Sequence, residues 1–210
     1  MKPKHVLVLP DQLTDQVGPL SLGEPGFTSV LMIESRAFAD GLSHHKKKLA
    51  VVFSAMRHFA ASLRANGFDV IYLQPADFPQ GISDYLRLHP GVTIDLMEPS
   101  DWGMRGELVG AAELAGGEIR VAPNELWLTT KEEFDVWAAD RKSLRLEYFY
   151  RAMRAARGWL MDGDKPSGGK WNYDADNRQV PKAGHRFPPI PCFEPDETTQ
   201  AVLREVNESW

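Results

Sequence analysis

Short apolar runs recur along the first part of the chain, and each of them ends at a polar residue or a proline. Four of the runs are clear, and a fifth is weaker. Apolar runs of this length are typical of strands that are buried on both faces of a parallel sheet. The expected strands cover residues 5–9, 29–33, 68–73, 93–97 and 118–122.

Between these runs the apolar residues take the spacing of helices. The clearest helix is expected at residues 45–65 and ends at Asn66-Gly67, a typical stop signal. Further helices are expected at 82–88 and from Ser100-Asp101, either of which can cap the helix, to about Gly116. The residues that recur on one face of the first helix are Leu49, Val52, Phe53, Met56, Phe59, Ala60 and Leu63.

Strands that alternate with helices predict crossover connections and therefore parallel strands. The sequence predicts an α/β fold, a Rossmann-like five-stranded parallel sheet with helices on both faces. This part is expected to span residues 1–128.

The pattern changes after this region. A helix is expected from residue 129 to 137, opened by a capping box between Thr130 and Glu133, and another from 144 to 161. Together they form an expected helical extension at 129–162. Residues 163–195 are rich in Gly, Pro, Asn and Asp, which predicts a linker without a core of its own.

The last residues, 197–210, have the pattern of a helix that begins and then stops. We expect Val202, Val206 and Trp210 to be exposed there, because no later element could cover them. Residues 163–210 are therefore predicted to be an interdomain linker followed by the start of a missing C-terminal domain.

Composition narrows the class of protein. The hydrophobic fraction is 43% and the charged fraction 25%, as in globular proteins, and no run approaches the ~18 apolar residues of a membrane helix. Asp11 interrupts the first apolar run, so no signal peptide is expected, and we expect a cytoplasmic protein. A net charge of −5 makes the chain a poor candidate for holding DNA alone.

Polar side chains follow the expected strands at the edge where open parallel sheets bind ligands. Asp11-Gln12 follows the first strand, Glu34 the second and Glu98 the fourth. There is no glycine-rich phosphate loop, so this crevice is expected to hydrogen-bond a polar heterocycle or sugar-like hydroxyls. The alternative is that Asp11 only caps the next segment and that Glu34 is a solvated loop residue.

Other reactive side chains give weaker indications. His44 and His45 are adjacent and do not face one point on a helix, so no metal site is expected, and His44 is interpreted as a residue of the helix start or the ligand edge. Ser43, Ser54 and Cys192 lie in no recognisable triad pattern, so we expect no catalytic residue. Cys192 is the single cysteine, which rules out an internal disulfide.

Four longer strings are more specific than this spacing. They are LPDQL at residues 9–13, HHKKK with FSAMRHFA at 44–60, RKSLRLEYFYR at 141–151 and GGKWNYDADNR at 168–178. Through these strings the chain resembles the photolyase-related proteins of the photolyase/cryptochrome family, namely the iron–sulfur bacterial cryptochromes and prokaryotic (6-4) photolyases. The resemblance covers essentially the whole chain.

The resemblance implies a site and a ligand. In that family the N-terminal α/β domain binds an antenna chromophore, 6,7-dimethyl-8-ribityllumazine. By resemblance, Asp11, Gln12 and Glu34 lie at the antenna pocket, and Phe53 and Met56 wall it. The family has a glycine where this chain has Pro10, and a proline fixes φ and removes a backbone donor, so Pro10 is expected to reshape the pocket.

The family's C-terminal helical domain holds FAD, a [4Fe–4S] cluster and the lesion pocket. Four thiolates hold such a cluster, and this chain has one cysteine, so the resemblance implies only the N-terminal portion. The expected partners are a C-terminal FAD domain, in the same parent chain or separate, and damaged DNA through the full-length parent. The chain alone is expected to be inactive.

Two alternatives remain open at this point. One is a cryptochrome-like signalling or partner-binding module without repair activity, which Pro10 would fit. The other is a small flavodoxin-like or nucleotide-binding enzyme, which needs a phosphate loop that the sequence does not show.

Overall fold

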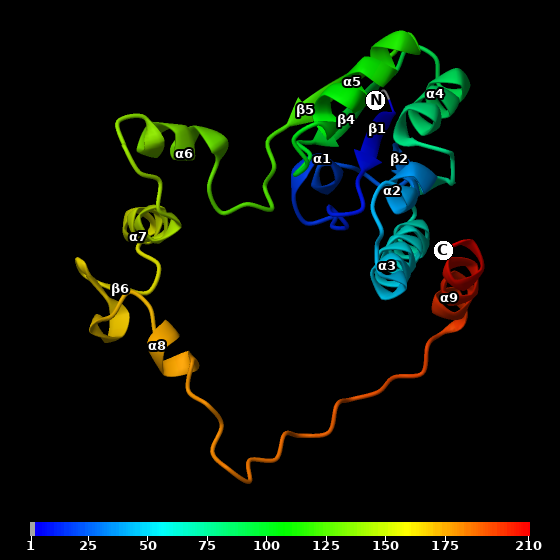
Figure 1. The fold of residues 1–210 in the computed structure, drawn as a ribbon. Helices are drawn as coiled ribbons and strands as arrows, with labels where there is room; N and C mark the ends of the chain where they lie inside the picture. Colours follow the sequence, from blue (N-terminus) through cyan, green and yellow to red (C-terminus); the bar gives the residue numbers. More distant parts are fainter. Residues whose placement is uncertain (1–2) are drawn as a thin grey trace. The chain divides into compact units, whose positions relative to one another are not determined.

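A computed structural model describes residues 3–210, which form two compact units (Figure 1). Unit 1 consists of residues 3–127 together with Glu194–Trp210, and unit 2 consists of Leu128–Phe193. Each unit is described by itself below.

Unit 1 is built on a five-stranded sheet in the order β3-β2-β1-β4-β5, in which every neighbouring pair is parallel. The predicted Rossmann-like α/β fold is therefore confirmed. The strand order reverses between β1 and β4, which lie side by side in the middle of the sheet. The strands are β1 (Lys4–Val8), β2 (Thr28–Ile33), β3 (Asp69–Leu73), β4 (Thr93–Met97) and β5 (Glu118–Ala122).

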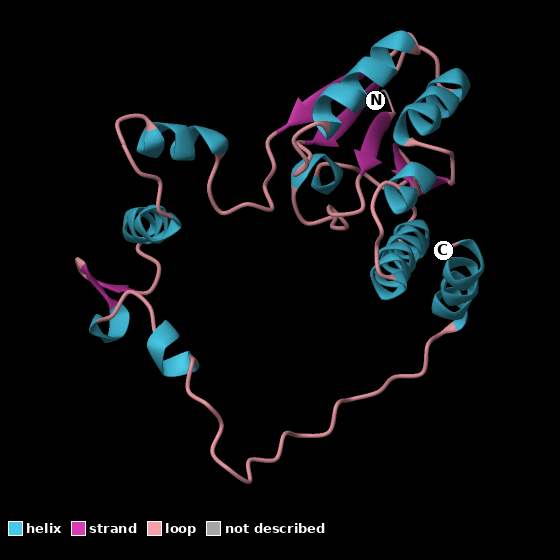
Figure 2. Ribbon diagram, viewed as in Figure 1, coloured by secondary structure: helices cyan, strands magenta, loops and turns pink. Residues whose placement is uncertain are grey.

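Two apolar cores lie on the two faces of this sheet because alternate residues of a strand point to opposite faces. Val6 and Val8 belong to the core beneath α3 and α9, whereas Leu7 and Leu9 belong to the core beneath α4 and α5. Helices thus cover both faces, as the sequence predicted (Figure 2). The helices of unit 1 are α1 (Gly18–Ser21), α2 (Arg36–Asp40), α3 (Lys46–Ala65), α4 (Phe78–Leu88), α5 (Met104–Leu114) and α9 (Glu197–Ser209).

Two helices begin elsewhere than predicted. Helix α4 begins at Phe78, before the expected Ile82, because the Asp77 side chain accepts from the backbone N–H of Gln80 and a proline is tolerated in a first helical turn. Helix α5 begins after Gly103 without a side-chain cap, so the expectation that Ser100 or Asp101 caps it is wrong.

The C-terminal helix differs most from its prediction. Helix α9 packs along α3 and completes unit 1 (Figure 1). Val202 and Val206 are buried between the two helices, and the Trp210 ring is half-buried near Phe53. The prediction that these three residues are exposed is therefore wrong, because the chain itself supplies the surface that covers them.

Unit 2 has short elements and little interior. The capping box of Thr130 and Glu133 opens its first helix, as predicted. The second helix ends at Gly158, which adopts a left-handed conformation. The elements are α6 (Lys131–Ala138), α7 (Leu146–Arg157), β6 (Met161–Asp162), β7 (Lys165–Pro166), a 3₁₀ turn (Ser167–Gly169) and α8 (Asp174–Asn177).

Candidate functional site

The loop after β1 reaches the carboxyl edge of the sheet at the point where strand order reverses. Gln12 is buried there, and its Nε2 donates to the carbonyl oxygens of Met97 and Glu98 at 3.1 and 3.0 Å. This amide ties the loop after β1 to the end of β4. Asp11 beside it is exposed and Pro10 is half-buried. Since open parallel sheets bind ligands at this crevice, Asp11 is the member of the pair that is accessible to one.

Glu34 follows β2 at the same edge, and its carboxylate is buried. Arg57 on α3 donates to both carboxylate oxygens, at 2.6 and 3.0 Å. The Gln74 amide donates at 2.7 Å, and the Tyr72 hydroxyl also donates. Arg57 makes a further contact of 2.6 Å with Glu205 of α9. Glu34 is therefore the centre of a polar network that joins β2, β3, α3 and α9.

The network changes the acidity of its donors. The hydrogen bond to Glu34 is the main reason that the pKa of Arg57 lies above its ordinary value. Burial, followed by the hydrogen bond to Glu34, raises the pKa of Tyr72. Both groups therefore keep their protons at neutral pH, and Glu34 accepts from a guanidinium and a neutral phenol.

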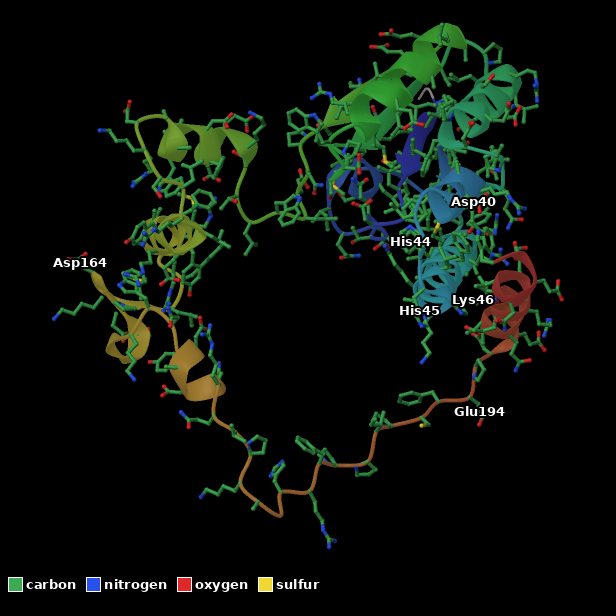
Figure 3. The ribbon with its side chains drawn as sticks, viewed as in Figure 1. Asp40, His44, His45, Lys46, Asp164 and Glu194 are labelled. Atoms are coloured by element: carbon green, nitrogen blue, oxygen red, sulfur yellow. The ribbon has the colours of Figure 1, made fainter. Side chains whose placement is uncertain are left out.

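The remaining residues of the predicted site lie apart from this network. Phe53 and Met56 are buried on the sheet-facing side of α3, in the first core. His44 lies just before α3 and is half-buried (Figure 3). Its ring centroid is 5.5 Å from that of Phe38, and its Nδ1 is 3.3 Å from Lys48 Nζ.

A hollow of about 330 Å³ opens at the same carboxyl edge. Its volume is in the range of small-molecule pockets, which begin at roughly 300 Å³. Its lining combines two aromatic rings with carboxyl groups, which is a suitable surface for a ring that carries hydroxyls. The lining residues, which follow β2, β3 and β4, are Ser35, Ala37, Phe38, Asp77, Phe78, Asp101, Gly103, Met104 and Glu107.

Sequence reasoning missed this hollow and the partners of Glu34. Asp77, directly before Phe78-Pro79, was a signal for a helix start at this edge. No local signal indicates Arg57 as the partner of Glu34, because it is a polar residue in the middle of a long amphipathic helix.

A second hollow, of about 470 Å³, lies beside the Glu34 network between α3, β3 and α9. Arg57, Tyr72 and Gln74 line it together with Arg64 and Thr198.

Within residues 3–210, no group of three or more His, Cys, Asp or Glu side chains is placed to hold a metal ion. No helix in that range is long and apolar enough to cross a membrane.

Comparison of the sequence with known protein families identifies a match. Residues 6–210 match the family described as deoxyribodipyrimidine photo-lyase-related protein. The chain belongs to this family. It is 39% identical over 208 residues to a (6-4) photolyase of Agrobacterium fabrum, a match that covers 96% of this chain and 41% of that protein.

A viral protein is also similar. The chain is 25% identical over 159 residues to an uncharacterized protein of Acanthamoeba polyphaga mimivirus, and the match covers 72% of this chain and 81% of that protein. This chain thus spans less than half the length of the photolyase relative, whereas its match to the viral protein covers most of that protein's length. The predicted resemblance to the photolyase-related proteins is confirmed.

Proposed function

We propose that this chain is the antenna-binding domain of a photolyase/cryptochrome-like flavoprotein whose full-length form repairs DNA photoproducts in light. The observation that carries the proposal is the 39% identity to a (6-4) photolyase over 96% of the chain. The proposed ligand is 6,7-dimethyl-8-ribityllumazine. FAD, the [4Fe–4S] cluster and damaged DNA belong to a C-terminal partner domain in this proposal, because one cysteine cannot supply four thiolates.

The carboxyl edge of unit 1 has groups that suit this ligand. The Phe38 ring, with His44 beside it, offers a flat surface to a bicyclic ring. The carboxylates of Asp77 and Asp101 in the same hollow accept hydrogen bonds, as the hydroxyls of a ribityl chain require. The exposed Asp11 follows β1 at the same carboxyl edge and is a further acceptor for such hydroxyls.

The other predicted site residues have supporting roles in this proposal. Glu34 accepts a hydrogen bond from Arg57, and Gln12 donates one to the carbonyl oxygen of Met97. In this proposal these two residues hold the loops that surround the ligand. Phe53 and Met56 keep α3 against the sheet from within the core. The bound lumazine would supply absorption of near-ultraviolet or blue light, and the residues of this chain would bind and orient it.

The test is a titration of the purified chain with the ribityl-lumazine, followed by absorption and by quenching of lumazine fluorescence. We expect saturable binding with a spectral shift. Asp101→Asn and Asp11→Asn should weaken it by about tenfold each, the effect of losing a hydrogen bond to a charged group.

Glu113→Gln is the matched control. Glu113 is an exposed acid near the C-terminal end of α5, and this end of the helix lies toward the opposite edge of the sheet. This variant should bind as the unaltered chain does. No binding to the unaltered chain would overturn the antenna role. Equal weakening by all three variants would overturn this location.

A further inference from the structure

Unit 2 is organised around an arginine where most domains have an apolar core. Of its residues only Arg154 and Pro166 are buried. The Arg154 guanidinium donates to the carbonyl oxygens of Trp159 at 2.9 Å and Trp171 at 3.2 Å, and also to that of Leu160. These bonds fix the chain after α7 against that helix, and they preform the surface that lies beside it.

That surface is a cavity of about 680 Å³, the volume of a small-molecule site. Two of the strings that identify the family meet in it. Glu147 comes from residues 141–151, Asn172 comes from residues 168–178, and the Asn172 amide donates to Glu147 at 3.1 Å. The lining residues are Leu146, Glu147, Tyr150, Arg154, Leu160, Ser167, Trp171, Asn172, Tyr173 and Asp174.

The lining combines aromatic faces with polar groups. Tyr150, Trp171 and Tyr173 supply aromatic rings, and the guanidinium groups of Arg151 and Arg154 lie 5.5 and 5.6 Å from the Trp171 ring. Carboxyl and amide groups of the same cavity accept and donate hydrogen bonds. A planar heterocycle with N–H and C=O groups on its rim matches this combination, because its face can stack while its edge is hydrogen-bonded.

Charge favours a heterocycle that is attached to phosphate. Unit 2 contains 12 lysines and arginines against nine aspartates and glutamates, whereas unit 1 contains 12 against 20. Three basic side chains, Arg151, Arg154 and Arg157, lie on α7, the helix that forms one wall of the cavity. Arg157 is paired with Glu133, Arg154 lines the cavity, and the partly exposed Arg151 lies beside Trp171. The negative carboxylate of Glu147 is paired with Arg151 at 2.7 Å. Its charge is therefore balanced and does not repel a phosphate in the cavity.

We propose that the unit 2 cavity binds a nucleobase, stacked on its aromatic rings, with the attached phosphate toward Arg151, the partly exposed arginine of α7 beside Trp171. The base can belong to a single strand of nucleic acid or to a free nucleotide, since both present the same chemistry. This inference does not rest on the antenna role, which concerns the other unit and another ligand.

The experiment uses the intact chain and fluorescently labelled oligonucleotides of about eight nucleotides. A thymidine oligonucleotide is compared with an abasic oligonucleotide of the same length and charge, by fluorescence anisotropy at fixed salt. We expect the thymidine strand to bind about tenfold more tightly, the effect of one stacked base. Displacement of the strand by thymidine monophosphate would identify a site for free nucleotides, and a preference that survives this competitor would identify a site for strands.

Variants locate the site. Trp171→Leu should remove the preference for the thymidine strand. Tyr173→Leu should reduce this preference, and it provides a second test of the cavity if Trp171→Leu does not fold. Trp102→Leu is the matched control, because Trp102 is 97% exposed, belongs to unit 1 and does not line the cavity. Equal affinity for the two strands, or a preference unchanged in both cavity variants, would overturn the proposal.

Discussion

At the scale of single residues, Glu34 shows how a buried charge is kept in a small α/β domain. Its carboxylate is 5% exposed and accepts from three side chains of β3, its following loop and α3. A buried ion pair adds modest stability as a whole, but removal of one partner leaves the other charge uncompensated. The consequence is that the two acids bonded to Arg57 should differ in their effect on stability.

We expect Glu34→Gln to lower the free energy of unfolding by about 3 kcal/mol, because Arg57 then keeps only the partly exposed Glu205 as a carboxylate partner. Glu205→Gln should cost under about 1 kcal/mol, since exposed ion pairs contribute little. Urea unfolding followed by circular dichroism measures both. Equal losses in the two variants would show that Glu34 is not the centre of the network.

His5 makes stability depend on pH. Burial, followed by the charge of His89, lowers the pKa of His5 below its ordinary value of about 6.5. The unfolded chain therefore binds a proton more readily than the folded chain as the pH falls. The stability contributed by neutral His5 is fully present above pH 6.5 and is lost as the pH falls through the folded pKa.

We expect the free energy of unfolding to decrease between about pH 7 and pH 5 and this decrease to be smaller in His5→Gln. Urea unfolding at several pH values measures it. His185→Gln, which alters an exposed histidine of unit 2, should keep the full pH dependence. An unaltered slope in His5→Gln would contradict the assignment to His5.

At the scale of elements, the sequence predicted the helices and strands that have a local pattern, but not the features that depend on packing between distant parts of the chain. The ends of the five strands and of α3 were predicted to within one residue, because a continuous apolar run and a helical stripe are local signals. The start of α4 was missed because its first residues, Phe78 and Pro79, lie before the apolar residues that marked the helix, although Asp77 caps it and the proline stands in the first turn.

The candidate site was less predictable than the sheet. The shared edge of Asp11 and Glu34 followed from strand direction, which the sequence indicated. The partners of Glu34 did not follow, because Arg57 is 23 residues away and Arg57 meets Glu205 at a separation of 148. Such pairs depend on how the helices pack in three dimensions, and the spacing of residues along the sequence does not predict that packing. The covering of α3 by α9 was missed for the same reason.

The packing of α9 on α3 gives a prediction for a single helix face. Val206→Ala removes apolar volume that is buried against α3 and should lower the stability of unit 1 by about 2 kcal/mol. Leu203→Ala alters a partly exposed residue of the same helix and should change it by less than about 0.5 kcal/mol. Hydrogen exchange of the α9 amides measures both effects, and equal loss of protection in the two variants would contradict the described face.

At the scale of the whole molecule, unit 1 is assembled from two distant parts of the chain. Residues 194–210 belong to it, although 66 residues of unit 2 precede them. The connection at residues 178–193 has no helix or strand, and all of its side chains are exposed. Proteases cut preferentially in exposed segments of this kind. Cleavage there would separate α9 from the covalent chain without removing the contacts that hold it on α3.

We therefore expect brief trypsin treatment to cut first after Arg178, Lys182 or Arg186, and the C-terminal fragment to co-elute with the rest of unit 1 in gel filtration. Buried Val202 and Val206, the Arg57–Glu205 ion pair and a hydrogen bond from Trp210 to Asp40 hold that fragment. Val206→Asp should allow the same cleavage but release the fragment, because it places a charge in the apolar contact. Separation of the unaltered fragment under native conditions would mean that covalent connection alone keeps α9 in place.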